Sequence, residues 1–388
     1  MRERDTLLSF HNPSIGEDEI SAVVEALREG WISSGPRVKR FEEEFAAAVG
    51  SKFAIAVNSG TAALHLALEA LGIGEGDEVI VPVMTFAATA EAAIYLGARP
   101  VFVDCRSDSL QMDKKEIARA VTVRTKAVVA VHYGGQACEM DPILQLAEDK
   151  RLAVVEDAAH AFPASYKGRN VGTLCDAAAF SFYATKTLAV GEGGMLTTDN
   201  EAIARRAGIM RLHGITHGGE FRDKKEGTWN YSIESVGYKY NMPEPQAAIG
   251  LVQLRRRGEL LARRFEIADR YRRNLARLDA IELPEVLPGR EHAWHLFVIK
   301  LNLGKLAIDR DSFIEELRKR KIGASVHFIP LHLQRFYADR FGLCAEDFPN
   351  ADAVFRRVLS LPIWPGMSDA DVDDVVAAVR EIVERHSA

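Results

Sequence analysis

The sequence has few cysteines and no long apolar segment, and both shortages narrow the classes of protein to which it can belong. Its four cysteines are scattered, with no CxxC pair and no histidine at metal-ligand spacing. We therefore expect reduced thiols and no metal centre. No stretch approaches the ~20 apolar residues of a membrane span, and the charged start MRERDTLLSF lacks a signal-peptide core. These absences predict a cytoplasmic protein.

Nucleotide-binding and repeat patterns are missing as well. The chain contains no GxGxxG sequence, no Walker A sequence and no internal repeat. A net charge of -6 provides no basic surface for nucleic acid. We interpret the one arginine run, Arg255 to Arg257, as a solvated helix face. Dinucleotide, P-loop and nucleic-acid functions therefore lack support.

What is present is an α/β pattern long enough for two domains. With 388 residues, the chain exceeds the size that one hydrophobic core usually serves. Between about Phe53 and Thr198, short β-branched runs alternate with helical patterns, which is typical of parallel strands joined by crossover helices. The expected strands are Phe53–Val57, Glu78–Val81, Pro100–Val103, Ala127–Val131, Leu152–Glu156, Ala177–Phe182 and Gly194–Thr197.

The C-terminal part reads differently, as a smaller α+β unit. A long helix is expected from Pro245 to about Leu278. The strand HLFVIKL, a helix from Asp311 to Lys319, the strand ASVHF and a terminal helix after Ser368 follow. We therefore expect a large domain at residues 15–250 and a small domain at residues 251–388, with residues 1–14 packing on the small one.

The segment NSGTAALHLALEAL places Ser59, Gly60 and Thr61 between an expected strand and a strongly helical run. The first turn of a helix has unpaired N–H groups and a positive dipole end, and Gly60 lets the backbone approach an anion closely. The segment can therefore cradle a phosphate. An ordinary helix cap formed by Ser59 or Thr61 is the alternative.

The segment VVEDAAHAF ends an apolar strand at Glu156 and Asp157, with His160 one helical turn later. Carboxyl ends of strands form the ligand crevice of open α/β sheets. An aspartate there suits the protonated pyridine nitrogen of pyridoxal phosphate (PLP), whose positive charge makes the ring an electron sink. The alternatives are a helix cap for Asp157 and a satisfied core histidine for His160.

A third segment, DAAAFSFYATKTLAVGEGGM, sets Lys186 just after a buried strand. Partial desolvation lowers the pKa of an ammonium group, which would supply the neutral amine that attacks an aldehyde. Ser181 can donate its hydroxyl to a cofactor phosphate. Gly191 to Gly194 allow tight turns beside a cofactor, although a plain loop between strands would look similar. In this order, the three segments predict PLP held as a Schiff base on Lys186.

Nine ordered segments resemble the DegT/DnrJ/EryC1/StrS family of PLP-dependent sugar aminotransferases. They span nearly the whole chain and read GWISSGPRVKRFEEEFA, NSGTAALHLAL, VIVPVMTFAATAEA, VEDAAHA, FSFYATKTLAVGEGGM, GYKYNMPEPQAAIGLVQL, HAWHLFVIKL, SVHFIPLH and SLPIWPGMSD. The resemblance implies PLP transferase fold type I, that of aspartate aminotransferase. This fold has a large domain with a mostly parallel central sheet flanked by helices, and a smaller α+β C-terminal domain.

The resemblance also implies roles for individual residues. Lys186 takes the place of the Schiff-base lysine and proton shuttle, Asp157 that of the partner of the pyridine nitrogen, and His160 lies near the ring hydroxyl. Phosphate contacts are implied for Ser59, Gly60, Thr61 and Ser181. Phe86 takes the place of the aromatic residue that stacks on the cofactor ring, although from the residues alone it could equally be a core side chain.

One segment departs from the family's commonest pattern, GYNYR. Here Lys239 stands at the Asn place and Asn241 at the Arg place. In the family this segment reaches across a dimer interface to the neighbouring cofactor phosphate, so either residue could make that contact. Substrate contacts are implied for Trp31, Ile32, Ser33, Ser34, His213, His327 and Phe328. Packing by Trp31 and backbone capping by His327 are the alternatives.

The expected function is a ping-pong transamination from an amino acid donor, L-glutamate, to a nucleotide-linked keto sugar. The resemblance implies amino sugar synthesis for cell-surface polysaccharide and a homodimer whose active sites are shared across the interface. Two alternatives stay open: a PLP-dependent sugar dehydratase, which would carry histidine in place of Lys186, and a non-catalytic regulatory or binding protein. Residues Thr216 to Tyr231 are expected to form a flexible loop near the sugar pocket.

Overall fold

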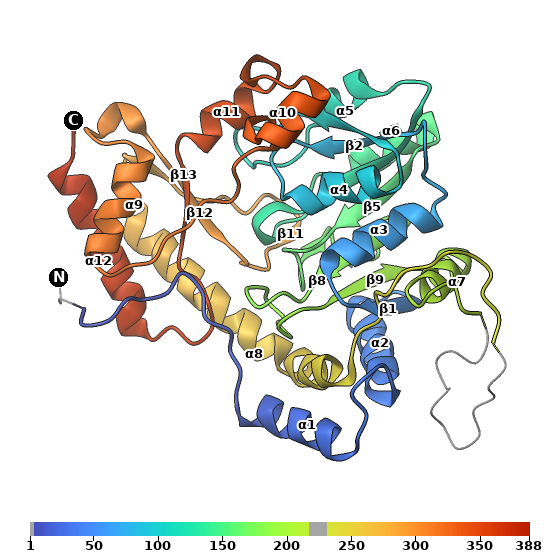
Figure 1. The fold of residues 1–388 in the computed structure, drawn as a ribbon. Coiled ribbons are helices and arrows are strands. Elements are labelled where there is room, and N and C mark those ends of the chain that lie inside the picture. Colours follow the sequence, from blue (N-terminus) through green and yellow to red (C-terminus); the bar gives the residue numbers. More distant parts are fainter. Residues whose placement is uncertain (1–3, 217–230) are drawn as a thin grey trace.

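The computed structural model describes residues 4–216 and 231–388 (Figure 1). All but the two ends of the loop expected between Thr216 and Tyr231 therefore lie outside the described residues. A seven-stranded sheet forms the centre of the larger part, in the order β1-β9-β8-β5-β4-β2-β3. Its strands are β1 (Phe53–Val57), β2 (Glu78–Pro82), β3 (Arg99–Val103), β4 (Thr125–Val131), β5 (Ala153–Asp157), β8 (Ala177–Ser181) and β9 (Gly194–Thr198). Each of the seven strands expected from the sequence is present.

The sheet is parallel except at β9. Strands β3, β2, β4, β5 and β8 pair in parallel, whereas β9 runs antiparallel to both β8 and β1. The segment that joins β8 to β9, residues 182–193, contains no crossover helix. A parallel pair needs such a crossover, so the short glycine-rich connection makes β9 turn back. The expected mostly parallel sheet is thus confirmed.

Helices cover both faces of this sheet, which explains why its strands are mostly apolar. In β4, Val129 belongs to the core formed with α3 (Gly60–Ala70), α4 (Ala87–Tyr95) and α7 (Glu201–Met210). Its neighbour Val128 belongs to the core on the other face. That second core is formed with α2 (Pro36–Val49), α5 (Lys114–Ala120) and α6 (Met140–Lys150). The result is a three-layer α/β arrangement.

A long helix, α8 (Glu244–Leu275), connects the two parts of the molecule. It contacts α1 (Glu17–Arg28) and α2 as well as α12 (Asp369–Arg385), and Figure 1 shows it running between these groups. The second part has a three-stranded sheet with the order β10-β12-β13. Its elements are β10 (Ile281–Glu282), β12 (Phe297–Leu301), α9 (Arg310–Lys319), α10 (Arg335–Phe341), α11 (Pro349–Phe355) and β13 (Val358–Leu361). A small third sheet consists of β11 (Arg290–Glu291), β6 (Ser165–Tyr166) and β7 (Arg169–Asn170).

The N-terminal segment joins the second part. Leu8 bridges Ile322 and belongs to the core formed by α8, α9, α12 and the β12–β13 pair. Further along, the last helix begins directly after Ser368, as the sequence predicted, and Ser368 caps it by accepting a hydrogen bond from the backbone N–H of Asp371 at 3.1 Å.

The prediction of a strand for ASVHF, residues 324–328, is wrong. The structure has only a single bridge there, between Ser325 and Ser360. Beyond that bridge the chain leaves the sheet, and both His327 and Phe328 line a cavity instead. The alternating apolar pattern of this segment therefore belongs to residues that line the cavity wall and do not pair in a sheet. Among the described residues, no helix is both long and apolar enough to cross a membrane.

Candidate active site

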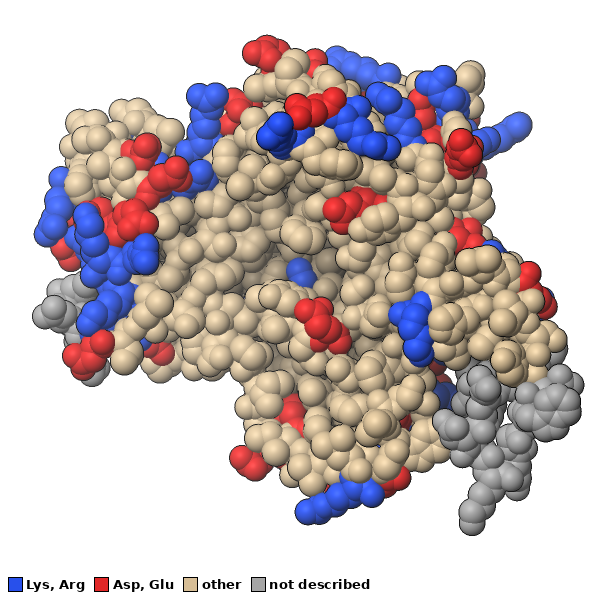
Figure 2. Space-filling model, in the orientation of Figure 1, with Lys and Arg blue, Asp and Glu red and all other residues tan. Residues whose placement is uncertain are grey.

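A cavity of about 450 Å³ opens at the carboxyl ends of β5 and β8, beside the N-terminus of α3. Figure 2 shows the molecule hollowed near the centre of this face, with mostly uncharged residues around the hollow. The cavity brings together residues from segments that are far apart in the chain. Those predicted from the sequence are Ser59, Gly60, Thr61, Phe86, Asp157, His160, Ser181, Lys186, His327 and Phe328.

The N-terminus of α3 forms one wall of the cavity. Ser59 caps the helix, since its Oγ accepts a hydrogen bond from the N–H of Ala62 at 3.1 Å. Gly60 is the first helical residue, and a Cβ there would lie 2.9 Å from the Cβ of Ser181. Only a glycine lets the helix come this close to the end of β8. Unpaired N–H groups and the hydroxyl of Ser181 therefore face one small space, where an anion would be stabilised.

Asp157 and its neighbour Glu156 point to opposite faces of the sheet, as successive strand residues must. Asp157 faces the cavity and is only 6% exposed. Glu156 lies on the other side, where its Oε2 is 2.9 Å from Nε2 of the buried His132. Because side chains alternate along a strand, Asp157 can contact a ligand in the cavity and Glu156 cannot.

Burial raises the pKa of the Asp157 carboxyl, and several nearby groups oppose this rise. Thr89 Oγ1 donates a hydrogen bond to Oδ2 at 2.7 Å, and the N–H of Ala159 donates to Oδ1 at 3.2 Å. The positive charges of Lys186 and His132 also favour the carboxylate. A cation bound at Asp157 would stabilise the carboxylate form further.

Lys186 lies in the turn after β8, where its N–H donates to the carbonyl of Tyr183 at 2.8 Å. Its side chain lines the same cavity as Asp157. Burial lowers the pKa of this amine to about 8, while the negative charge of Asp157 raises it. The site therefore contains a lysine that reaches its neutral, nucleophilic form far more readily than a surface lysine.

His160 belongs to a buried aromatic cluster. Its Nδ1 accepts a hydrogen bond from the N–H of Gly134 at 3.3 Å. Burial and the charge of Lys186 hold the pKa of His160 well below its usual value. A neutral ring that accepts at Nδ1 carries its proton on Nε2. The His160 ring stacks on Phe328 with centroids 5.6 Å apart and lies 4.4 Å from the ring of His295.

Phe86 is not a core residue, which removes that alternative. Its side chain is 62% exposed although the residue lines the cavity, and its ring lies 5.9 Å from that of Phe328. A phenylalanine so exposed in one chain is available to a ligand or to a partner.

Residues 13–380 match the sequence profile of the DegT/DnrJ/EryC1/StrS aminotransferase family. The chain belongs to this family. Spore coat polysaccharide biosynthesis protein SpsC of Bacillus subtilis is 50% identical over 385 residues, which cover 99% of each chain. Spr1654 of Streptococcus pneumoniae, assigned as a sugar aminotransferase and solved in a PLP form, superposes with a TM-score of 0.92 and 34% identity over 98% of this chain and 99% of that one.

PseC of Helicobacter pylori, an aminotransferase involved in pseudoaminic acid biosynthesis, superposes with a TM-score of 0.90 and 26% identity over 98% of this chain and all of that one. The fold is therefore PLP fold type I, and this family member is a PLP-dependent sugar aminotransferase. The family match and the lysine at position 186 favour transamination over the dehydratase and binding-protein alternatives.

The cavity of this sugar aminotransferase fits PLP. A Cβ at position 60 would intrude on the space beside Ser181. Because Gly60 has none, that space at the N-terminus of α3 stays open for a phosphate. An acid suited to the pyridine nitrogen and an amine suited to the aldehyde, Asp157 and Lys186, both line the cavity. These features match the three functional groups of the cofactor.

The segment that we expected to reach across a dimer interface lies outside the cavity of its own chain. Lys239 Nζ donates to Oδ1 of Asn241 at 2.6 Å, and Nδ2 of Asn241 donates to Oγ of Ser34 at 2.8 Å. These residues and four others expected in the cofactor or sugar site do not line the cavity: Trp31, Ile32, Ser33 and His213. One chain thus brings together ten of the expected residues and leaves this second group apart.

Several cavity residues were missed in the sequence analysis: Phe10, Thr85, Tyr183, Glu192, His295 and Ser325. Thr85 and His295 stand in motifs that the family resemblance had already marked, VIVPVMTFAATAEA and HAWHLFVIKL. The position of Thr85 shortly after β2 was the available signal, because polar residues after strands face the crevice. Phe10 had no such signal, since only the packing of the N-terminal segment brings it to the cavity.

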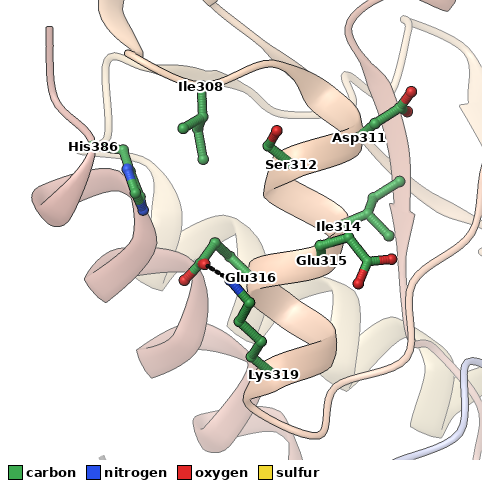
Figure 3. A pocket seen from close by; sticks show the side chains of 8 residues that line it. All are labelled: Ile308, Asp311, Ser312, Ile314, Glu315, Glu316, Lys319 and His386. Carbon is green, nitrogen blue, oxygen red and sulfur yellow. Dashed lines mark hydrogen bonds and ion pairs between the residues drawn. The ribbon is translucent and has the colours of Figure 1, made fainter.

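A second hollow, of about 470 Å³, lies along α9 at the far end of the molecule (Figure 3). One of the three acidic residues that line it, Glu316, is paired with Lys319 at 2.7 Å and with Arg320. None of the expected site residues lines it. Within the described ranges, no group of three histidine, cysteine or acidic side chains could hold a metal ion.

Proposed function

We propose that this enzyme moves an amino group from L-glutamate to a nucleotide-linked keto sugar in two half-reactions at one site. The observation that carries the proposal is the meeting of Lys186 and Asp157 in one cavity with the N-terminus of α3. PLP supplies an electron sink and carries the amino group between the two substrates. The protein residues bind it, orient it and move protons.

In this proposal Lys186 is the proton carrier. Its pKa of about 8 lets the amine gain and lose a proton near neutral pH, as a general acid and base must. Asp157 would hold the cationic ring nitrogen, and His160, whose proton is on Nε2, would donate to the ring hydroxyl. Ser59, Gly60, Thr61 and Ser181 bind the phosphate, and Phe86 covers the ring.

The acceptor would lie against the wall formed by His327 and Phe328. Burial and the charge of Lys186 lower the pKa of His327 to about 4, so this ring is a neutral donor and acceptor suited to sugar hydroxyls. Its Nδ1 lies 2.9 Å from Oγ of Ser360, which orients the ring. Tyr183 lines the cavity yet is 46% exposed, and its ring offers a face for a flat group outside the cavity.

The proposal includes a homodimer with shared sites. Lys239 or Asn241 would then reach the cofactor phosphate of the partner, and Trp31, Ile32, Ser33 and His213 its sugar pocket. Exposed apolar side chains near these segments support an interface, since Ile32 is 66% exposed and Val236 is 91% exposed. The likeness to SpsC supports a role in cell-surface polysaccharide synthesis. Four free cysteines fit the reducing cytoplasm.

The test separates the half-reactions. Purified enzyme with PLP should convert one equivalent of glutamate to 2-oxoglutarate without any sugar, and the resulting amino form should then aminate a nucleotide-linked keto sugar. Lys186→Ala should bind PLP without covalent attachment and lose at least about 1,000-fold in the first half-reaction, because it lacks the proton carrier. Unchanged turnover by that variant would refute the role of Lys186. Amination of the free sugar but not its nucleotide form would refute the acceptor.

A further inference from the structure

The hydroxyl groups of Thr85 and Thr89 form a chain that ends on Asp157. Thr89 Oγ1 donates to Asp157 Oδ2 at 2.7 Å, and Thr85 Oγ1 lies 2.7 Å from Thr89 Oγ1. All three side chains are buried, with 2% exposure for Thr85, none for Thr89 and 6% for Asp157. In the described residues, no other side chain donates a hydrogen bond to this carboxyl.

The hydroxyl of Thr89 joins two separate elements. Thr89 is the third residue of α4, and its hydroxyl bonds the carboxylate of Asp157 at the end of β5. A fully buried hydroxyl needs a hydrogen bond, so this side chain and the carboxylate satisfy each other.

The direction of the chain follows from proton counting. A carboxylate only accepts, and Thr89 has one proton, which goes to Asp157. The contact between the two threonines then needs the proton of Thr85. Because its proton is used in this way, Thr85 can offer only its lone pairs to a ligand. Thr85 lines the cavity, whereas Thr89 does not.

We propose that Thr85 and Thr89 act as a hydroxyl relay that keeps Asp157 ionised and oriented towards the ring nitrogen of PLP. Thr89 is the positioning residue, and Thr85 sets the direction of the Thr89 proton. The inference rests on the proposed role of Asp157. Burial alone would favour the neutral acid, which cannot hold a cationic ring nitrogen by charge, and a charge-assisted hydrogen bond opposes that tendency.

The experiment compares four variants of the full-length enzyme. Thr89→Val keeps the shape of the side chain and removes the hydroxyl, whereas Thr89→Ser keeps the hydroxyl and removes a methyl group. Thr85→Val removes only the outer hydroxyl. The control is Thr197→Val, because Thr197 is equally buried and donates to the carbonyl of Gly172 at 2.9 Å without touching Asp157.

Two readouts do not depend on turnover. One is the dissociation constant of PLP, measured by ultrafiltration. The other is the NMR shift of the ring nitrogen in enzyme loaded with isotope-labelled PLP, which reports the protonation of that nitrogen. Thr89→Val should weaken PLP binding about tenfold and move the ring-nitrogen signal towards the unprotonated form. Thr85→Val should change both in the same direction by less, and Thr89→Ser and Thr197→Val should resemble the unmodified enzyme.

An Asp157→Asn variant separates this inference from the role on which it rests. If Asp157→Asn shifts the ring-nitrogen signal and Thr89→Val leaves it unchanged, the relay is refuted and the role of Asp157 stands. If Asp157→Asn also leaves the signal unchanged, both are refuted. Equal effects of Thr89→Val and Thr89→Ser would show that packing matters and not the hydroxyl, which would overturn the relay. If Thr89→Val does not fold, Thr85→Val decides on the same signal.

Discussion

At the scale of single residues, the proposed chemistry depends on the balance between burial and charge at Lys186 and Asp157. Burial lowers the pKa of the amine and raises that of the carboxyl, so each group alone would tend to its neutral form. Their opposite charges counteract both shifts. This balance suits PLP, which needs a neutral amine beside its aldehyde and a carboxylate beside its ring nitrogen.

This balance predicts how PLP capture depends on pH. In apoenzyme, the fraction of neutral Lys186 rises with pH and is half complete at its pKa, about 8. The rate of covalent attachment of PLP, followed by its visible absorbance, should therefore reach half of its maximum at about pH 8 and level off above about pH 9. Asp157→Asn should shift this midpoint to lower pH because it removes a charge that raises the pKa. A rate that keeps climbing to about pH 10, as for an ordinary lysine, would contradict the lowered pKa.

At the scale of elements, the close approach of α3 to β8 creates the space in which we propose that the phosphate is bound. The contact depends on Gly60, whose absent side chain leaves room for Ser181. Since the helix N-terminus acts within about its first turn, a small displacement of α3 would weaken its hold on an anion.

Gly60→Ala should therefore weaken PLP binding by about tenfold or more, because the new Cβ forces the N-terminus of α3 away from Ser181. The measurement is the PLP dissociation constant together with the melting temperature. Gly208→Ala is the matched control: Gly208 lies in α7, and a Cβ there would meet nothing within 4 Å. It should leave PLP binding unchanged and raise the free energy of unfolding by about 0.5–1 kcal/mol. Equal PLP affinity in both variants would argue against the cradle.

At the scale of the whole molecule, the question is which residues act in their own chain and which act in a partner. Lys186 and Asp157 share a cavity, whereas Lys239 contacts Asn241 outside it. A closed homodimer would place the second group at the cavity of the other chain.

Mixed dimers test this division. Lys186→Ala and Lys239→Ala enzymes, unfolded and refolded together in equal amounts, should recover about a quarter of the unmodified activity. Half of the dimers would then be mixed, and each of these would keep one intact site. A mixture of Lys186→Ala with Asp157→Asn should recover almost nothing if the roles are as proposed, since each intact site then needs both residues from one chain. Recovery in neither mixture would show that Lys239 does not act across the interface.

The sequence by itself determined the sheet and about half of the residues that line the cavity. Its apolar runs marked all seven strands, because strands covered by helices on both faces are mostly apolar. Polar residues after those runs, such as Asp157 and Ser181, were identifiable because strand ends of a parallel sheet meet at one edge. Lys186 was identifiable from its place after a buried strand and from the family motif.

Only the tertiary structure decided the contacts between distant segments. It shows residues 324–328 as a cavity wall and not as a strand, because the chain leaves β13 after one bridge. It also reveals that Thr89 reaches Asp157 and that Phe10 lines the cavity. Local patterns show which face of an element is apolar, but they contain no information about which other element packs against that face. The packing of one element on another depends on the whole chain, and the hydroxyl of Thr89 therefore finds its partner Asp157 only in the folded structure.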